Sequence, residues 1–135
     1  MKKVLVDTTI WIDAFNDVEK ETSKVLIELI ESDQKVFIAP VILQEILQGF
    51  NKEKDFESAK DYLSGFELVG LDDAFNDSVE SARLYRTCRK KGSSIRKSND
   101  CLIAWLAIKN ELELFHNDKD FSEIAKHTKL KVFSY

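Results

Sequence analysis

Five short apolar segments alternate with longer segments of helical periodicity, and this alternation is the feature that most constrains the fold. The apolar segments hold about four to six residues, which suits strands and is too short for helices. Strands of nearly continuous apolar character are typical of a parallel sheet covered by helices on both faces, so the predicted class is α/β. The predicted strands are Lys3–Val6, Val36–Ala39, Phe66–Leu71, Glu113–His116 and Lys131–Ser134.

Apolar residues between these strands recur at the spacing of helices. Pro40 follows the second strand and suits the first position of a helix. Asp72 or Asp73 suits the cap of a long helix that ends at Gly92. Its predicted apolar face holds Phe75, Val79, Ala82, Tyr85 and Cys88. Further helices are predicted over residues 22–31, 40–50, 52–63, 100–110 and 121–127, with Ser98 or Asn99 as cap of the fourth.

The length of 135 residues predicts a single domain over residues 1–135, because domains usually hold about 100–200 residues. Hydrophobic residues make up 44% and charged residues 33% of the chain, a balance that excludes a disordered protein. No apolar segment approaches the roughly 20 residues of a membrane span. The apolar run after Lys2 and Lys3 is too short for an export signal. We therefore expect a cytoplasmic protein in which Cys88 and Cys101 are buried free thiols.

Four acidic residues are placed so that they can meet at one edge of the predicted sheet. Asp7 follows the first strand, and Asp118 follows the fourth by two residues. Asp100 lies in the first turn of a buried helix, and Glu45 lies on the helix after the second strand. Sites in parallel sheets form at the carboxyl ends of the strands. Each acid alone has an ordinary use in a turn, at a helix end or on the surface, but those uses do not explain the convergence.

Neighbouring carboxylates repel one another, and their pKa values rise unless a cation neutralises them. Oxygen ligands of this kind suit Mg²⁺ or Mn²⁺ rather than zinc. Phosphodiester hydrolysis is the chemistry that uses such a cluster, because the metal lowers the pKa of the attacking water and neutralises charge on the phosphate. His116 and His127 lack the spacing of a zinc site. The motifs of nucleotide-binding loops and serine hydrolases are absent from the sequence.

The basic residues are distributed unevenly. The net charge of −4 argues weakly against non-specific nucleic-acid binding, yet residues 83–97 carry seven basic residues and no acid. This segment is either a solvated helix end that favours the helix dipole or a strip that contacts RNA. The candidates for RNA contact are Arg86, Arg89, Arg96 and Lys97.

Four blocks of the sequence resemble the PIN-domain family. They are residues 4–13, 44–49, 99–104 and 116–121, in the order and spacing of that family, so the resemblance covers the whole chain. The small single-domain form is most similar to VapC-type toxins of prokaryotic toxin–antitoxin pairs. The resemblance implies a three-layer α/β/α sandwich with a central, mostly parallel sheet. It also implies a metal-dependent endoribonuclease that cleaves RNA.

The resemblance further implies roles for single residues. The positions of the acidic metal site correspond to Asp7, Glu45, Asp100 and Asp118. Thr9 matches the small hydroxyl or amide position that supports the first Asp. Asn117 and Asp120 flank the last acid, and Asp120 could replace Asp118 as a ligand of Mg²⁺ or Mn²⁺. The family also implies a homodimer and a cognate antitoxin that blocks the site.

Two other functions stay open from the sequence. The first is a non-catalytic PIN-like module that binds RNA or protein, against which the four intact acids argue. The second is a receiver-like signalling domain, which would need paired acids after the first strand and a lysine after the last. Only Asp7 stands at the first of those places, and the last predicted strand ends next to Tyr135.

Overall fold

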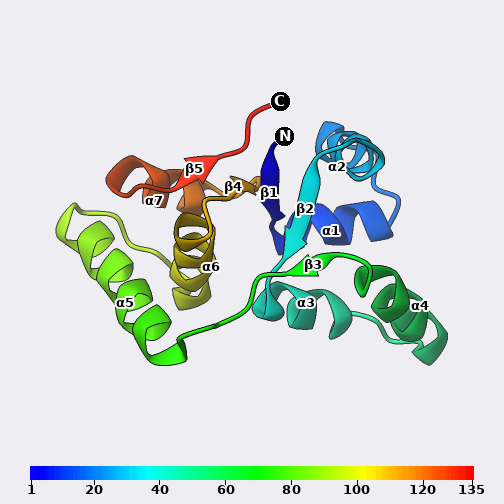
Figure 1. Cartoon of the computed structure of the whole chain (residues 1–135), viewed down its shortest axis with the longest axis horizontal. Helices are drawn as coiled ribbons and strands as arrows, with labels where there is room; N and C mark the ends of the chain where they lie inside the picture. Colours follow the sequence, from blue (N-terminus) through cyan, green and yellow to red (C-terminus); the bar gives the residue numbers. More distant parts are fainter.

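The computed structural model describes all 135 residues and contains one five-stranded sheet. The strands are β1 Lys3–Val6, β2 Lys35–Ile38, β3 Glu67–Leu68, β4 Glu113–Phe115 and β5 Lys131–Val132. Their order across the sheet is β3-β2-β1-β4-β5, and every neighbouring pair is parallel (Figure 1). The prediction of a parallel sheet is confirmed.

Seven helices connect and cover these strands. They are α1 Thr8–Phe15, α2 Glu21–Glu31, α3 Pro40–Leu47, α4 Glu53–Leu63, α5 Ala74–Lys90, α6 Ser98–Lys109 and α7 Lys119–His127. Crossovers between parallel strands are right-handed, so helices on the way to β2 and β3 cover one face, and those on the way to β4 and β5 cover the other. Accordingly, α1 to α4 pack among themselves and α5 to α7 pack among themselves, on opposite sides of the sheet (Figure 1). The α/β/α sandwich is confirmed.

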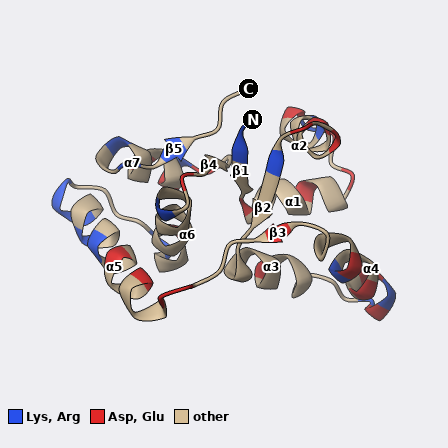
Figure 2. Ribbon diagram, viewed as in Figure 1, with Lys and Arg blue, Asp and Glu red and all other residues tan.

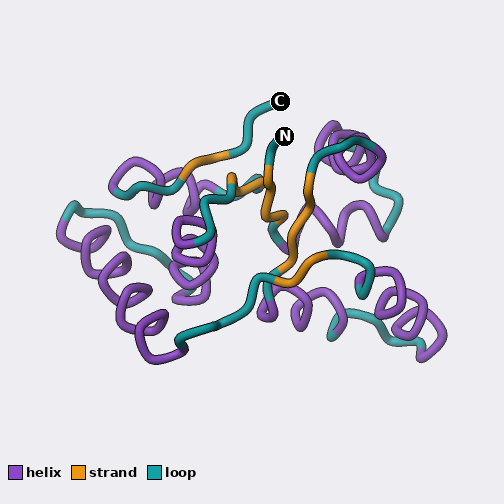
Figure 3. The backbone as a smooth tube through the Cα atoms, in the orientation of Figure 1, coloured by secondary structure: helices purple, strands orange, loops and turns teal.

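The strand order reverses between β1 and β4. The chain steps from β1 to β2 and β3 in one direction, and from β4 to β5 in the other. Open α/β sheets bind ligands at such a switch point, outside the carboxyl ends of the strands. The backbone N–H of Asp7 donates to the carbonyl of Phe115 at 2.9 Å, so the segments that follow β1 and β4 leave the sheet side by side (Figure 3).

The core is a cluster of 28 buried apolar residues centred on β1 and α6. Val4, Leu5 and Val6 are all 0% exposed. Successive side chains of a strand point to opposite faces, so their common burial means that both faces of β1 are covered. Cys88 and Cys101 are buried and free, as predicted. None of the helices is long and apolar enough to span a membrane.

Helix α1 is an element that the sequence pattern did not predict. Residues 8–15 follow β1 directly and begin with β-branched residues, which have modest helix propensity. Tertiary packing stabilises the helix: Ile10 and Trp11 are buried, and the Trp11 indole donates to the carbonyl of Val6 at 3.1 Å. Two predicted strands are shorter than expected, since β3 and β5 have only two residues each. Both are exposed strands at the edges of the sheet.

The predicted apolar face of α5 is wrong at its beginning, where Phe75 is 83% exposed. The face that meets α6 is set by Asp77, which lies roughly 200° around the helix from Phe75. Asp77 is fully buried and accepts hydrogen bonds from the Trp105 indole at 2.8 Å and the Lys109 ammonium at 3.0 Å. A polar anchor therefore replaces the expected apolar contact.

The ends of three helices can be compared with the capping and terminating residues that the sequence predicted. Pro40 begins α3, and the Asp73 side chain caps α5 by accepting from the N–H of Asn76, as predicted. Gly92 ends α5 with a φ of 86°, a conformation that favours glycine. The predicted cap of α6 is wrong, because that helix begins at Ser98 and has no side-chain cap.

Candidate active site

The residues after β1 and β4 lie side by side at the switch point of the sheet. Asp7 precedes α1, and Asp118 precedes α7. A hydrogen bond joins the two segments, because the Thr9 hydroxyl donates to the Asn117 side-chain oxygen at 2.8 Å. Asp7 and Asp118 are thus held at the same edge of the sheet, as the sequence predicted.

Glu45 and Asp100 approach this edge from two helices. Glu45 lies on α3, and its carboxylate accepts a hydrogen bond from the Thr8 hydroxyl at 2.8 Å. Asp100 lies in the first turn of α6 and is 6% exposed. Its Oδ2 atom is buried and has no hydrogen-bond partner. A buried carboxylate oxygen without a partner is costly, and it indicates that the site is built for a further ligand.

The carboxylates influence one another's ionisation. Burial raises the pKa of Asp7 to about 6, and the charges of Glu45 and Asp118 add to this effect, while a backbone hydrogen bond from Thr8 opposes it. Burial likewise raises the pKa of Asp100 to about 7, with further contributions from Asp7 and Asp118. The four predicted acids are therefore close enough to interact.

Asp120 and Asp118 have different partners. Asp120 is buried, and its Oδ2 atom accepts a hydrogen bond from Nε of Arg96 at 3.2 Å. The Arg96 guanidinium lies 3.8 Å from Oδ1 of Asp118. That oxygen also caps α7 by accepting from the N–H of Asp120, whereas Oδ2 of Asp118 makes no hydrogen bond. An arginine thus neutralises Asp120 directly and Asp118 only in part.

The donor set fits Mg²⁺ or Mn²⁺ in kind, because it offers carboxylate oxygens and includes the unpartnered Oδ2 atom of Asp100. The four acids do not form a ready-made metal site, because no three acidic, histidine or cysteine side chains lie close enough together to hold a metal ion.

The predicted basic residues separate into two groups. The charge of Lys97 lowers the pKa values of Asp7 and Asp100, so Lys97 lies beside the acids, together with Arg96. Arg86 and Arg89 line a cleft between α5 and the first residue of α6. Figure 2 shows basic residues along the second half of α5.

Two positioning residues were missed in the sequence. Thr8, rather than Thr9, supports an acid of the site through its bond to Glu45, and Thr9 bonds Asn117 instead of Asp7. The Nδ1 atom of His116 accepts from the N–H of Asp118 at 3.0 Å and orients that segment. The only sequence signal for Thr8 was a hydroxyl directly after the first Asp.

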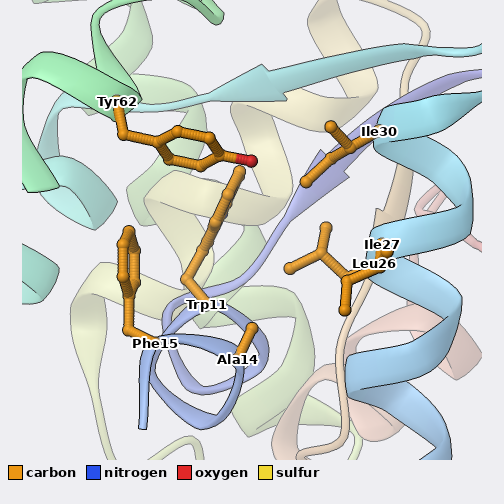
Figure 4. A pocket seen from close by; sticks show the side chains of 7 residues that line it. All are labelled: Trp11, Ala14, Phe15, Leu26, Ile27, Ile30 and Tyr62. Carbon is orange, nitrogen blue, oxygen red and sulfur yellow. The ribbon is translucent and has the colours of Figure 1, made fainter. Parts of the chain in front are cut away.

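A second, apolar hollow of about 240 Å³ lies between α1, α2 and α4 (Figure 4). Its lining residues are Trp11, Ala14, Phe15, Leu26, Ile27, Ile30 and Tyr62. Ile27 and Tyr62 remain 50% and 49% exposed. Exposed apolar side chains around a hollow are characteristic of a protein-interaction surface.

The family model described as PIN domain matches residues 4–127 of this chain. The chain belongs to the PIN-domain family. VapC ribonuclease Mb1587 of Mycobacterium bovis is 31% identical over 133 residues, which cover 98% of each protein. The resemblance of the sequence to PIN domains and VapC-type proteins is confirmed.

Solved structures of low sequence identity have the same fold. VapBC2 of Rickettsia felis, bound to a DNA fragment from its promoter, superposes with a TM-score of 0.77 and 22% identity over 98% of both chains. DNA-bound VapBC of Salmonella typhimurium gives a TM-score of 0.74 and 17% identity, also over 98% of both chains. These two complexes support the fold of this chain.

Proposed function

We propose that this PIN-domain chain is a Mg²⁺- or Mn²⁺-dependent endoribonuclease that acts in the cytoplasm as the toxin of a toxin–antitoxin pair. The observation that carries the proposal is the convergence of Asp7, Glu45, Asp100 and Asp118 at the switch point, with one carboxylate oxygen buried and unpartnered. The ribonuclease name of the Mycobacterium bovis relative supports the same reaction.

A bound divalent ion supplies a Lewis acid that lowers the pKa of the attacking water and neutralises charge on the scissile phosphate. Asp7, Glu45, Asp100 and Asp118 are the residues that would hold this ion. Asp7 and Asp100, whose pKa values are raised, would bind it in their deprotonated forms. The Thr8 hydroxyl orients Glu45, and the bond between Thr9 and Asn117 holds the segments after β1 and β4 together.

Asp118 is our choice for the fourth ligand, because its Oδ2 atom is free while Asp120 is engaged by Arg96. Asp120 then acts as a positioning residue for the guanidinium. Arg96 and Lys97 lie beside the acids and provide positive charge where an RNA phosphate must approach a negative site.

Incubation of the purified protein with single-stranded RNA tests this function. We expect cleavage with Mn²⁺ and none with EDTA, because the carboxylates alone supply neither the Lewis acid nor an activated water. Cleavage that persists in EDTA would contradict the metal dependence. Binding without cleavage under all metal conditions would favour the non-catalytic module.

The apolar hollow between α1, α2 and α4 is the surface that we assign to the antitoxin. Two solved structures with this fold are described as toxin–antitoxin systems, so a protein partner is expected. A lining that is wholly apolar fits the apolar face of an amphipathic helix, which docks into such grooves through residues spaced one turn apart. The homodimer implied by the sequence resemblance stays a prediction that size-exclusion chromatography can check.

Replacing Ile27 by Asp is expected to abolish co-purification with a co-expressed cognate antitoxin, while RNA cleavage continues. A carboxylate in the hollow would be desolvated by the partner, and Ile27 lies away from the acids. Val18→Asp is the matched control, because Val18 is exposed and lies outside the hollow. Equal loss in both variants would contradict this docking surface.

A further inference from the structure

A cleft of about 380 Å³ lies between α5 and the beginning of α6. Two arginines, one tyrosine and three serines line most of it, and no acidic side chain does. The exposed lining is mainly apolar, and its polar groups are cations and hydroxyls without a carboxylate, so an anion would meet no repelling charge there. None of the four acids lines this cleft.

The two arginines of the cleft carry charges that the protein does not neutralise. Arg86 and Arg89 are exposed, and neither forms an ion pair, whereas Arg83 pairs with Glu80 and Arg96 pairs with Asp120. They lie one turn apart on α5, so their side chains are neighbours. The Arg89 guanidinium lies 5.7 Å from the centre of the Tyr85 ring, which restrains its direction.

The position of the cleft connects it to the acidic centre. Ser98, which lines the cleft, is the first residue of α6 and precedes Asp100 by two residues, so the two side chains leave the helix about 200° apart. The connection is made by Lys97, which precedes Ser98 and acts electrostatically on both Asp7 and Asp100. A strand that runs from the acids to the cleft would therefore pass the segment that carries Arg96 and Lys97.

We propose that this cleft binds the phosphodiester backbone of the RNA strand next to the cleaved bond. The proposal rests on the proposed function, since it names the path that the substrate takes away from the acids. Arginine guanidinium groups bind phosphate oxygens in pairs of hydrogen bonds. The hydroxyls of Ser78 and Ser81 already donate to helix carbonyls, so their oxygens are available to accept from a ribose 2′-hydroxyl.

The test measures binding of a fluorescent single-stranded RNA oligonucleotide in EDTA, at several salt concentrations, by anisotropy. The double variant Arg86→Gln, Arg89→Gln is expected to raise Kd about tenfold or more. It should also reduce the salt slope by about 1.4, the value for two lost contacts to a single strand. Lys90→Gln, Lys91→Gln is the matched control, because both lysines are exposed, lie outside the cleft and carry the same charge.

Three results would overturn the cleft as an RNA site. They are no loss of affinity in the arginine variant, an equal loss in the lysine control, and equal affinity of the wild type for single-stranded DNA of the same sequence. Wild-type protein that fails to bind RNA at all also overturns it. All four residues are exposed and without ion pairs, so the melting temperatures should be unchanged.

Failure of the cleft and failure of the proposed function give different results. Binding is measured without metal, so it does not depend on cleavage. If the wild type cleaves RNA with Mn²⁺ and the arginine variant binds like the wild type, the cleft alone is wrong. If the wild type binds through Arg86 and Arg89 but never cleaves, the endoribonuclease proposal is wrong and the cleft stands.

Discussion

Asp100→Asn is expected to abolish RNA cleavage while leaving the protein folded. The amide has nearly the shape of the carboxylate, but it loses the negative charge on the buried oxygen that has no partner in the protein. With Mn²⁺ we expect a loss of at least about 10³-fold in cleavage rate, the order seen when one member of a cooperative catalytic group is removed. Asp7→Asn and Glu45→Gln should behave alike. Gel-based cleavage rates and circular dichroism measure the two effects.

Asp118→Asn and Asp120→Asn form the internal control for this prediction. Loss of Asp118 should weaken both cleavage and the stabilisation by Mn²⁺. Loss of Asp120 should reduce cleavage less and leave that stabilisation nearly unchanged, because Asp120 holds Arg96 rather than the metal. If Asp120→Asn were the more damaging change, our choice of the fourth ligand would be wrong.

The sequence predicted that the four acids lie at the same edge of the sheet, because the end of each strand can be recognised from the apolar run that precedes it. Asp7 and Asp118 each follow an apolar run, and the carboxyl ends of parallel strands meet at one edge. Glu45 lies within two turns of the start of a helix that Pro40 marks, and Asp100 lies in the first turn of a helix that its apolar spacing marks. These features depend on neighbours in the chain, so they can be recognised without the fold.

The features that could not be predicted depend on contacts between distant segments. The exposed Phe75 and the buried Asp77 follow from partners on α6, which are about 30 residues further along the chain. The pairing of Arg96 with Asp120 joins the loop before α6 to α7. Nothing in the charge pattern of residues 83–97 distinguishes the arginine beside the acids from the two in the cleft.

The metal-free protein is expected to be less stable at pH 8 than at pH 5. Asp7 and Asp100 have folded-state pKa values of about 6 and about 7, raised first by burial, against an ordinary value of 3.8. Because the folded state binds their protons more tightly than the unfolded state, stability falls as the pH rises from about 4 to 8. The penalty reaches its full value only above about pH 8, and the decline between pH 5 and 8 is on the order of 3 kcal/mol once solvent screening is allowed for, or roughly 10 °C in Tm.

The buried Asp77 changes stability outside this pH range. Hydrogen bonding, first from Trp105, lowers the pKa of Asp77, so its contribution is present above its ordinary value and is lost only at more acidic pH. His116 acts within this pH range in the opposite direction, because burial lowers its pKa and its contribution to stability therefore rises with pH. The share of Asp100 in the decline is read from the difference between the wild type and Asp100→Asn. Thermal melts in EDTA across this range measure it, and Asp100→Asn should remove a large part of the decline.

Millimolar Mn²⁺ should reverse the loss at pH 8, because the ion binds only the folded cluster and neutralises its charge. Stabilisation by mass action reaches about 2.7 kcal/mol when the free ion is at 100 times its Kd. Asp100→Asn removes both the repulsion and a ligand, so its melting temperature in EDTA should be higher and its response to Mn²⁺ smaller than in the wild type. A wild-type Tm that is independent of pH and of Mn²⁺ up to ~10 mM would contradict a carboxylate metal site at this edge of the sheet.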